Sequence, residues 1–540
     1  MVSMRTLRWS IALSFWVFAA TPPVAYAQKF PPVIWDDDDR QTVPEPETRK
    51  LADWYDFLSG TFGEPALRLF DMPRNFRKLA GKPKEAENIN GVDEVPNSSW
   101  FTNRNFSKPL SPEEFARGPN ITDGPDLSGP WTVIQCKTQG VTPGITIHDV
   151  RGDVYLLKFD PPEYPELTSA ADVIGSKIFH AAGYNVPENS IVFFTPDRLK
   201  LGPGCLIIDE FGRAEPLTQA MLDEMLRNIP KTHDGKLRAI ASKFLPGKPK
   251  GPFSYSGWRE DDPNDVIVHE HRRELRGLRV IAAFINHNDI RQINTLDMYV
   301  EENGRKFLKH HFIDFGATLG SASVFPNRPY EGIEYFFDTA EILKRTVTLG
   351  LYPRKWQKSP EVKYPAVGYF ESELFDPGNW KPNYPIASFE NMSGRDGYWG
   401  AKIVASFTDA QIEAAVRAGR ISDPEAERFL LNVLKRRRDR IAEHWFRRIG
   451  PLDRFRIEQG RLWFDDLAVQ GGYDCVDCAS YQVNVGARSE IVKAGEPVVL
   501  PELDHIRVRL TRISKGWPQH SVDVHTRREN GVVKIVGVKR

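Results

Sequence analysis

Residues 282–321, AAFINHNDIRQINTLDMYVEENGRKFLKHHFIDFGATLGS, decide the fold that we expect for the centre of this 540-residue chain. The segment opens as the end of an apolar helix. It continues through a polar loop into two runs typical of strands, Leu296–Glu301 and Lys306–Asp314. Asn303-Gly304 separates the two runs, and this dipeptide favours a two-residue turn between antiparallel strands. The segment therefore predicts a β-hairpin.

The predicted hairpin would gather three polar side chains at one end. Asp289 and Asn294 lie in the loop before its first strand, and Asp314 closes its second strand. Amide and carboxylate oxygens are ligands that suit Mg²⁺, and a further carboxylate can act as a base. In the alternative interpretation, Asp289 and Asn294 only form turns and Asp314 is only a cap.

The composition is typical of a folded protein with several domains. The chain is long enough for two to four domains, and 41% of its residues are hydrophobic and 11% aromatic. Lys plus Arg and Asp plus Glu both number 72, so no net charge indicates a nucleic acid as partner.

The first 27 residues have the pattern of a secretory signal peptide. Arg5 and Arg8 precede the apolar run Trp9–Ala20, and Ala25-Tyr26-Ala27 is a small-x-small cleavage site. No later stretch reaches about 18 apolar residues, so we expect no membrane span in the mature chain. We therefore expect a bacterial protein that is exported to the periplasm or secreted. An uncleaved N-terminal anchor is the alternative.

Four cysteines fit export without requiring it. Cys475 and Cys478 form a Cys-x-x-Cys pair, whereas Cys136 and Cys205 are far apart in sequence. Either pair could be a disulfide in an oxidising compartment. For Cys475 and Cys478 we favour a structural loop closure or two free thiols, because no second ligand pair completes a zinc site.

Upstream of the hairpin, the chain predicts a small twisted sheet with one helix. The third of three strand-like runs carries Lys158, and the helix follows at Leu167–Ala182 with Thr168 or Ser169 as N-cap and Gly183 as C-cap. The expected strands are Trp131–Lys137, Ile145–Asp149, Val154–Phe159, Ser190–Thr195 and Cys205–Phe211. A lysine on such a strand, fixed by a carboxylate on the helix, is a way to hold phosphates.

These residues together resemble the atypical branch of the protein-kinase-like superfamily. The chain is similar to HipA-type kinases and, more loosely, to CotH-type secreted kinases and phosphoinositide kinases. The resemblance is carried by Lys158 in YLLKFD, Asp172 on the helix before Gly183-Tyr-Asn-Val-Pro187, the Asp289/Asn294 pair in NHNDIRQIN and Asp314 in IDFG. Their order and spacing match over roughly residues 130–320.

The resemblance implies a role for each residue and a cofactor. Asp289 would orient or deprotonate the hydroxyl of a protein or small-molecule acceptor. Asn294 and Asp314 would bind Mg²⁺ or Mn²⁺ between the phosphates of ATP, and Lys158 would neutralise phosphate charge. Asp172 would position Lys158.

The chain departs from the family pattern at three places. The hairpin that would cover the phosphates has Gly140 and Gly144 but no G-x-G-x-x-G. Asp172 stands where the helix usually carries Glu, and Glu166 is an alternative partner for Lys158. His287 precedes Asp289 with an Asn between them, in place of His-Arg-Asp.

The remaining segments complete an α+β fold: a two-lobed kinase-like core with a C-terminal all-β, sandwich-like domain. We expect an N-terminal extension with a short helix at 28–125, an N-lobe at 126–212, a helical C-lobe at 213–449 and the β domain at 450–540. The short helix is Glu47–Gly60, with Leu51, Trp54, Tyr55 and Leu58 on one face.

Two functions from different classes follow. The first is an exported kinase-like phosphotransferase, and the second is a catalytically inactive kinase-like scaffold or binding protein of the cell envelope. Two histidine groups, His269-Glu270-His271 and His310-His311, suggest a metal, but we favour solvated or capping histidines because His269 and His271 would not share a helix face.

Overall fold

The predicted hairpin forms. In the computed structural model, which describes residues 39–137, 144–208 and 213–540, it consists of β9 (Thr295–Glu302) and β10 (Arg305–Phe312). The strands pair from Glu302 with Arg305 to Thr295 with Phe312. Asn303 and Gly304 form the turn with φ values of 51° and 75°, as a type I′ turn requires. The short β8 (Lys248–Pro249) pairs with β9.

The larger sheet contains the strands expected upstream of the hairpin. In the described part of the chain, seven strands pair in the order β4-β7-β3-β2-β1-β5-β6, with β1 and β5 parallel and the other pairs antiparallel. Their bounds are β1 (Trp131–Lys137), β2 (Gly144–His148), β3 (Val154–Lys158), β4 (Asn189–Phe194), β5 (Leu199–Ile208), β6 (Ala214–Pro216) and β7 (Leu237–Lys243).

This sheet extends beyond residue 212, where we expected the N-lobe to end. β7 lies between β3 and β4, and α6 (Gln219–Arg227) packs Leu222 and Leu226 into the same apolar cluster as the sheet. The run at 237–243, LRAIASK, lacks a clear apolar alternation, because both faces of this central strand are covered.

Helix α5 (Leu167–Ala182) has the bounds and the C-cap that we expected, with Gly183 at φ 124°. Neither Thr168 nor Ser169 is its N-cap: Glu166 occupies that position and its side chain makes no cap hydrogen bond. Asp160 instead accepts hydrogen bonds from the backbone N–H and the hydroxyl of Ser169, at 2.8 and 2.6 Å. The helix is buried along almost its whole length.

The helical region packs around α7 (Arg273–Ile285). Its core continues from α5 through α7 to the helices that follow. These are α9 (Ala387–Glu390), α10 (Gly394–Ala405), α11 (Asp409–Ala418) and α12 (Pro424–Ile449), with α4 (Pro112–Arg117) against α11. Short 3-10 turns are η2 (Pro196–Arg198), η3 (His269–His271), η4 (Gln292–Asn294) and η5 (Lys355–Lys358).

Of the four histidines that we expected to be solvated or capping, His269, His310 and His311 are buried instead, and His271 is partly exposed. His269 contacts Asp265 (Nε2 to Oδ2, 2.6 Å), and His310 contacts Asp297 (Nδ1 to Oδ1, 2.6 Å). The His310 ring stacks on Trp100 at a centroid distance of 3.6 Å. These histidines are packing residues whose ring nitrogens are paired with buried carboxylates.

The C-terminal region contains two antiparallel sheets that share one apolar cluster. Its elements are β11 (Leu452–Glu458), β12 (Arg461–Asp466), α13 (Leu467–Gln470), η6 (Val476–Cys478), β13 (Ala479–Val485), β14 (Arg488–Lys493), β15 (Val498–Val499), β16 (His505–Ser514), β17 (Ser521–Glu529) and β18 (Val532–Lys539). Cys475 and Cys478 are joined in a disulfide, whereas Cys136 and Cys205 are free and buried.

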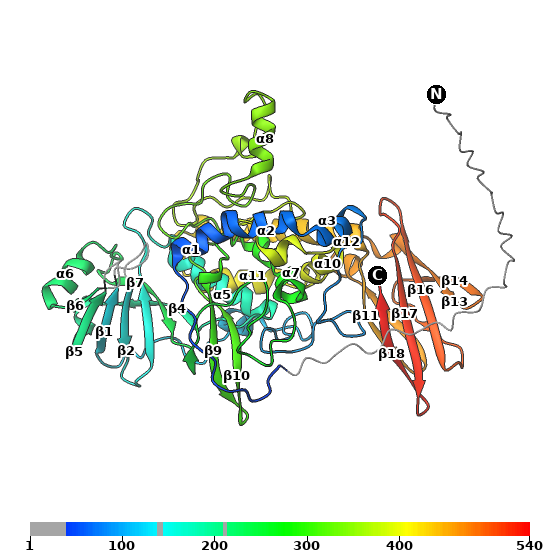
Figure 1. The fold of residues 1–540 in the computed structure, drawn as a ribbon, viewed down its shortest axis with the longest axis horizontal. Coiled ribbons are helices and arrows are strands. Elements are labelled where there is room, and N and C mark those ends of the chain that lie inside the picture. Colours follow the sequence, from blue (N-terminus) through cyan, green and yellow to red (C-terminus); the bar gives the residue numbers. More distant parts are fainter. Residues whose placement is uncertain (1–38, 138–143, 209–212) are drawn as a thin grey trace, which may run out of the picture.

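A band of short helices crosses the helical region, and one helix projects from it (Figure 1). The band consists of α1 (Asp53–Leu58), the π-helical turn η1 (Ser59–Gly63), α2 (Glu64–Phe70) and α3 (Met72–Leu79), and the projecting helix is α8 (Thr339–Val347). Among the described residues, no helix has the length and apolar character needed to cross a membrane. The predicted signal peptide and the hairpin glycine Gly140 lie outside the described residues.

Candidate functional site

Lys158 lies between two carboxylates from different elements. It is the last residue of β3, and its Nζ is 3.4 Å from Oδ2 of Asp172 on α5 and 3.1 Å from Oδ1 of Asp314, just after β10. The backbone of Lys158 also pairs with Gly144 of β2. The sheet, the helix and the hairpin therefore meet at one ammonium group.

Asp172, and not Glu166, is the partner of Lys158. The Asp172 carboxylate is almost fully buried, and its second oxygen accepts a hydrogen bond from Nδ2 of Asn189 at 2.7 Å. Glu166 instead accepts a hydrogen bond from the backbone N–H of Ser422 at 2.8 Å. The Asp172 side chain is one methylene shorter than the glutamate usual at this position, but it still reaches the ammonium group because Lys158 lies close to α5.

The turn after Asp314 packs tightly against α5. Asp314 has a left-handed backbone with φ 60°, and Phe315 is fully buried against Phe179 and His287. A Cβ added to Gly175 on α5 would lie 3.0 Å from Cβ of Phe315. The absence of a side chain at Gly175 thus lets the helix and this turn approach, which fixes the position of Asp314 relative to Lys158.

The loop before β9 holds Asp289 between an amide and a guanidinium group. Nδ2 of Asn294 donates to the backbone carbonyl and to Oδ2 of Asp289, at 2.7 and 3.0 Å. Nε of Arg291 lies 2.6 Å from Oδ1 of Asp289. The backbone N–H of Ile313 donates to the carbonyl of Asn294 at 3.0 Å, which places Asn294 beside the segment that carries Asp314.

Burial and charge shift the pKa values in this cluster in opposite directions. Burial raises the pKa of Asp289, and the guanidinium of Arg291 only partly offsets this rise. Burial also raises the pKa of Asp172. Loss of water alone would raise the pKa of Asp314 too, but the Lys158 ammonium lowers it below its ordinary value. Burial lowers the pKa of His287 to about 4, so this histidine is neutral at pH 7.

The donor set fits a hard divalent cation. Nδ2 of Asn294 is turned toward Asp289, and Oδ1 of Asn294 accepts no hydrogen bond from a described residue. The Asp314 carboxylate is about half exposed, at 46%, and has an ionised ground state. One amide oxygen and one carboxylate, with room for water and phosphate, are the protein ligands that Mg²⁺ and Mn²⁺ commonly use.

An N-terminal helix reaches this loop, which sequence reasoning did not predict. Arg291 NH1 lies 2.7 Å from Oδ1 of Asp53 on α1, so one guanidinium bridges Asp53 and Asp289. The next turn of α1 carries Asp56, which is fully buried and accepts a hydrogen bond from the hydroxyl of Tyr384 at 2.9 Å. The only sequence signal for this contact is Arg291 itself, two residues after Asp289.

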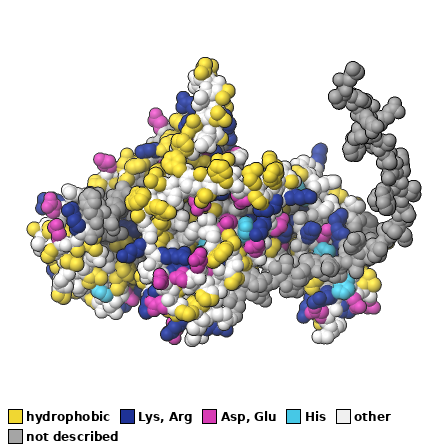
Figure 2. Space-filling model, in the orientation of Figure 1, with side chains coloured by type: hydrophobic (Ala, Val, Ile, Leu, Met, Phe, Trp, Pro, Cys, Tyr) yellow, Lys and Arg dark blue, Asp and Glu magenta, His cyan; other side chains and the backbone are white. Residues whose placement is uncertain are grey.

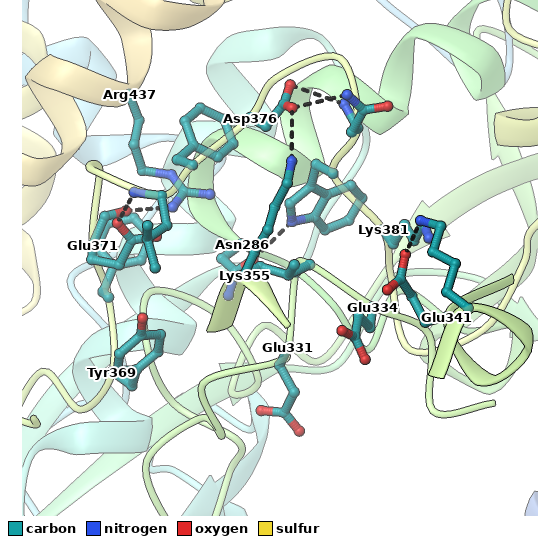
Figure 3. Close-up of a pocket in the computed structure, with 18 of the residues that line it drawn as sticks. Asn286, Glu331, Glu334, Glu341, Lys355, Tyr369, Glu371, Asp376, Lys381 and Arg437 are labelled. Atoms are coloured by element: carbon teal, nitrogen blue, oxygen red, sulfur yellow. Dashed lines mark hydrogen bonds and ion pairs between the residues drawn. The ribbon is translucent and has the colours of Figure 1, made fainter. Parts of the chain in front are cut away.

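A cavity of about 280 Å³ opens next to the same loop. Asn286, which ends α7 just before the loop, is part of its wall. Figure 3 shows acidic and basic side chains facing one another around it, with Lys355 Nζ 3.8 Å from Asp376 Oδ2. Burial raises the pKa of Glu331 in this wall to about 7, and the negative charge of Asp289 contributes to that rise.

Comparisons of the structure with solved structures give weak similarity. No family model matches the chain, and no curated protein matches it. Two solved structures of the Golgi casein kinase, one with Mn/ADP bound, are similar to this chain at 11% identity with TM-scores of 0.26 and 0.24. Both alignments cover 76% of this chain and 97% and 96% of the other chain. The chemistry assigned to the site depends on the geometry above.

Proposed function

We propose that the protein is an exported kinase-like phosphotransferase that uses ATP with Mg²⁺ or Mn²⁺ to modify a protein or small-molecule acceptor. The observation that carries the proposal is the position of Lys158, whose ammonium lies between a buried helix carboxylate and the half-exposed Asp314. Taking a lysine and its carboxylate partners out of water has a large desolvation cost, so this ion pair is weak evidence of a purely stabilising role. Phosphate oxygens are anions that this charge can bind. Export is inferred from the signal-peptide pattern of the first 27 residues.

The proposed roles follow from the contacts. Lys158 would bind phosphate oxygens, and Asp172 would keep its ammonium in place. Asn294 and Asp314 would hold the divalent ion, which supplies neutralising charge to the phosphates. Asp289 would take the proton of an acceptor hydroxyl at Oδ2, while Arg291 on Oδ1 orients the carboxylate.

The acceptor would enter through the cavity beside Asp289. Its wall carries the acidic side chains of Glu331 and Glu334 and the basic side chains of Lys355 and Lys381. A wall with both charges suits a polar acceptor that carries hydroxyl groups. Loops of the segment 351–400 contribute much of this wall, so acceptor specificity would reside there.

Thermal melting with ATP and Mg²⁺ or Mn²⁺ tests the proposal. We expect a nucleotide- and metal-dependent rise in Tm for the wild type that Asp314→Ala abolishes. Asp504→Ala, which replaces an exposed aspartate near β16, is the matched control and should keep the rise. Mass spectrometry of candidate acceptors incubated with ATP would then show a phosphoryl mass increase. A Tm that does not respond to nucleotide in any variant contradicts the proposal.

The inactive-scaffold alternative has one observation in its favour. Arg291 occupies Oδ1 of Asp289 and is itself bound to Asp53 of α1, so the carboxylate is partly neutralised. A scaffold of this kind would have a higher Tm in the presence of nucleotide but would transfer no phosphoryl group. The melting and mass-spectrometry results together distinguish the two functions.

A further inference from the structure

The helices that lie over the core expose large apolar side chains in a continuous row. We call this row the apolar ridge and define it by Trp54, Phe62, Phe70, Leu79, Leu343 and Leu349. Phe70 is 81%, Leu79 85% and Leu349 90% exposed. Figure 2 shows hydrophobic side chains along the band of α1–α3 and over the projecting α8. Apolar exposure on this scale and in one row marks an interaction surface.

The band is attached to the protein by its polar side. Nε of Arg74 donates to Oδ1 of Asn391 at 2.8 Å, and Arg68 NH2 donates to the carbonyl of Pro385 at 3.3 Å. No residue of α2, α3 or α8 is buried. A surface helix usually turns its apolar face to the core. Here the orientation is reversed, and the apolar face that sequence periodicity assigns to a core is directed to solvent.

The band and the base of α8 form one surface because aromatic pairs join them. The Phe62 and Phe337 rings have centroids 5.3 Å apart, and those of Phe57 and Phe336 are 6.3 Å apart. Phe62 and Phe337 are themselves about half exposed. The ridge therefore continues from the band onto the projecting helix without an intervening polar strip at this junction.

Positive charge is concentrated on two segments that carry four of the six ridge residues. Residues 64–84 contain six Lys or Arg and two Asp or Glu, and residues 339–363 contain the same numbers, in a chain whose formal net charge is zero. Several of these cations are exposed and form no ion pair with a described residue: Arg77, Lys78, Lys82, Arg345 and Lys358. Such an arrangement is complementary to a surface with both anionic and apolar layers.

We propose that the apolar ridge binds the surface of an anionic phospholipid bilayer. Its apolar side chains would enter the boundary between headgroups and acyl chains, and the surrounding lysines and arginines would contact lipid phosphates. The shape favours a bilayer over a folded partner, because α8 projects outward from the helical region (Figure 1). This inference is independent of the proposed phosphotransferase activity.

Vesicle co-sedimentation of the full chain tests the proposal. We expect binding to phosphatidylcholine vesicles that contain phosphatidylglycerol, and weaker binding to phosphatidylcholine alone. Arg77→Gln, Lys78→Gln and Arg345→Gln should each weaken binding to the anionic vesicles about fivefold. Phe70→Ser, Leu79→Ser and Leu349→Ser should each weaken it about tenfold. Because these side chains are exposed, the melting temperature should stay unchanged.

Matched controls distinguish vesicle binding by the ridge from nonspecific binding by other exposed apolar side chains and from binding by the predicted signal segment. Ile491→Ser and Val532→Ser remove apolar side chains that are 68% and 59% exposed on β14 and β18, and they should bind as the wild type does. The signal segment, where retained, is the same in every variant. Binding that survives the three ridge substitutions and the three substitutions of the surrounding cations overturns the proposal. So does a ridge-dependent dimer in sedimentation velocity without vesicles, which would make a second copy of the chain the partner.

Discussion

Lys158 is the single residue on which the charge balance of the candidate site depends. Replacing it with Met would leave the buried Asp172 near Asp314 without a cationic partner, with hydrogen bonds from Asn189 and the backbone of Phe315. We expect Lys158→Met to lower the free energy of unfolding at pH 7 by up to about 3 kcal/mol, because water at the half-exposed Asp314 reduces the full cost of breaking a buried pair. Urea denaturation measures this, and Lys200→Met, on exposed β5, should change little.

The pH dependence of Lys158→Met has a definite sign. Burial raises the pKa of Asp172 in the folded state, so its contribution to stability is present below the unfolded value of about 3.9 and is lost as pH rises through the folded value. Without the Lys158 ammonium, the folded pKa of Asp172 rises further and more stability is lost on ionisation. The free energy of unfolding of the variant should therefore differ most from that of the wild type at neutral pH and least in acid. Asp172→Asn added to Lys158→Met should recover part of the stability. A double variant that is less stable than Lys158→Met contradicts the pairing.

Arg291 gives a second prediction at this scale, conditional on the proposed activity. A carboxylate base works when ionised, so the rate rises with pH through the pKa of Asp289. Arg291 lowers that pKa, against the larger effect of burial. Arg291→Gln should therefore move the acidic limb of the kcat/KM profile to higher pH. Arg428→Gln, an exposed change on α12, should leave the profile unchanged. A limb that stays in place would argue against Asp289 as the base.

Among the elements, α5 is terminated by a glycine that no other residue can replace. Gly183 has φ 124°, and an added Cβ would lie 2.2 Å from Cε2 of Phe101 and 2.8 Å from the carbonyl of Thr102. Gly304 in the hairpin turn has φ 75° and open space around it. Gly304→Ala should lower the free energy of unfolding by about 1–2 kcal/mol, the cost of the backbone strain alone. Gly183→Ala should lower it by clearly more, because the added Cβ also meets Phe101 and Thr102. Equal losses in urea denaturation would show that Phe101 moves away easily.

The elements also show how much the sequence could predict. α5 and the β9–β10 hairpin were predicted closely because a glycine C-cap and an Asn-Gly turn are local signals. β7 was missed because its place between β3 and β4 is set by long-range pairing. Sequence periodicity gave the apolar face of α1 but not its direction, since the Asp53–Arg291 contact that holds the helix is tertiary. The roles of the site residues remain predictions.

At the scale of the whole molecule, a buried charge network joins regions that are far apart in sequence. Arg540, which follows β18, contacts Asp93 (3.3 Å) and Asp453 on β11 (2.7 Å). Asp93 also pairs with Arg273 of α7 at 2.6 Å. An apolar cluster that includes Phe446 of α12 and Ala468 of α13 lies in the same region. We infer that the C-terminal sheets unfold together with the helical region.

Asp93 is the centre of this network, and its substitution gives the last prediction. Burial alone would raise the pKa of Asp93, but the guanidinium groups of Arg273, Arg395 and Arg540 lower it well below its ordinary value. Its stabilisation is therefore present above the unfolded pKa of about 3.9 and is lost as pH falls toward the folded value. Asp93 has φ 67°, which Asn tolerates, so Asp93→Asn removes the charge without new backbone strain.

We expect Asp93→Asn to cost about 3–5 kcal/mol at pH 7, because the buried Arg273 and Arg540 and the partly exposed Arg395 lose their shared partner. The cost should decrease progressively as pH falls below about 4 toward the folded pKa of Asp93. Calorimetry should show one transition for the wild type. In the variant, the calorimetric transition should broaden, since Asp93 no longer joins Arg540 to Arg273, while Lys402 and Tyr398 of α10 still contact Asp453. Asp504→Asn, which changes an exposed aspartate in the same C-terminal region, should change neither the stability nor the calorimetric transition. A pH-independent loss in Asp93→Asn would mean that hydrogen bonding, and not charge, holds the network.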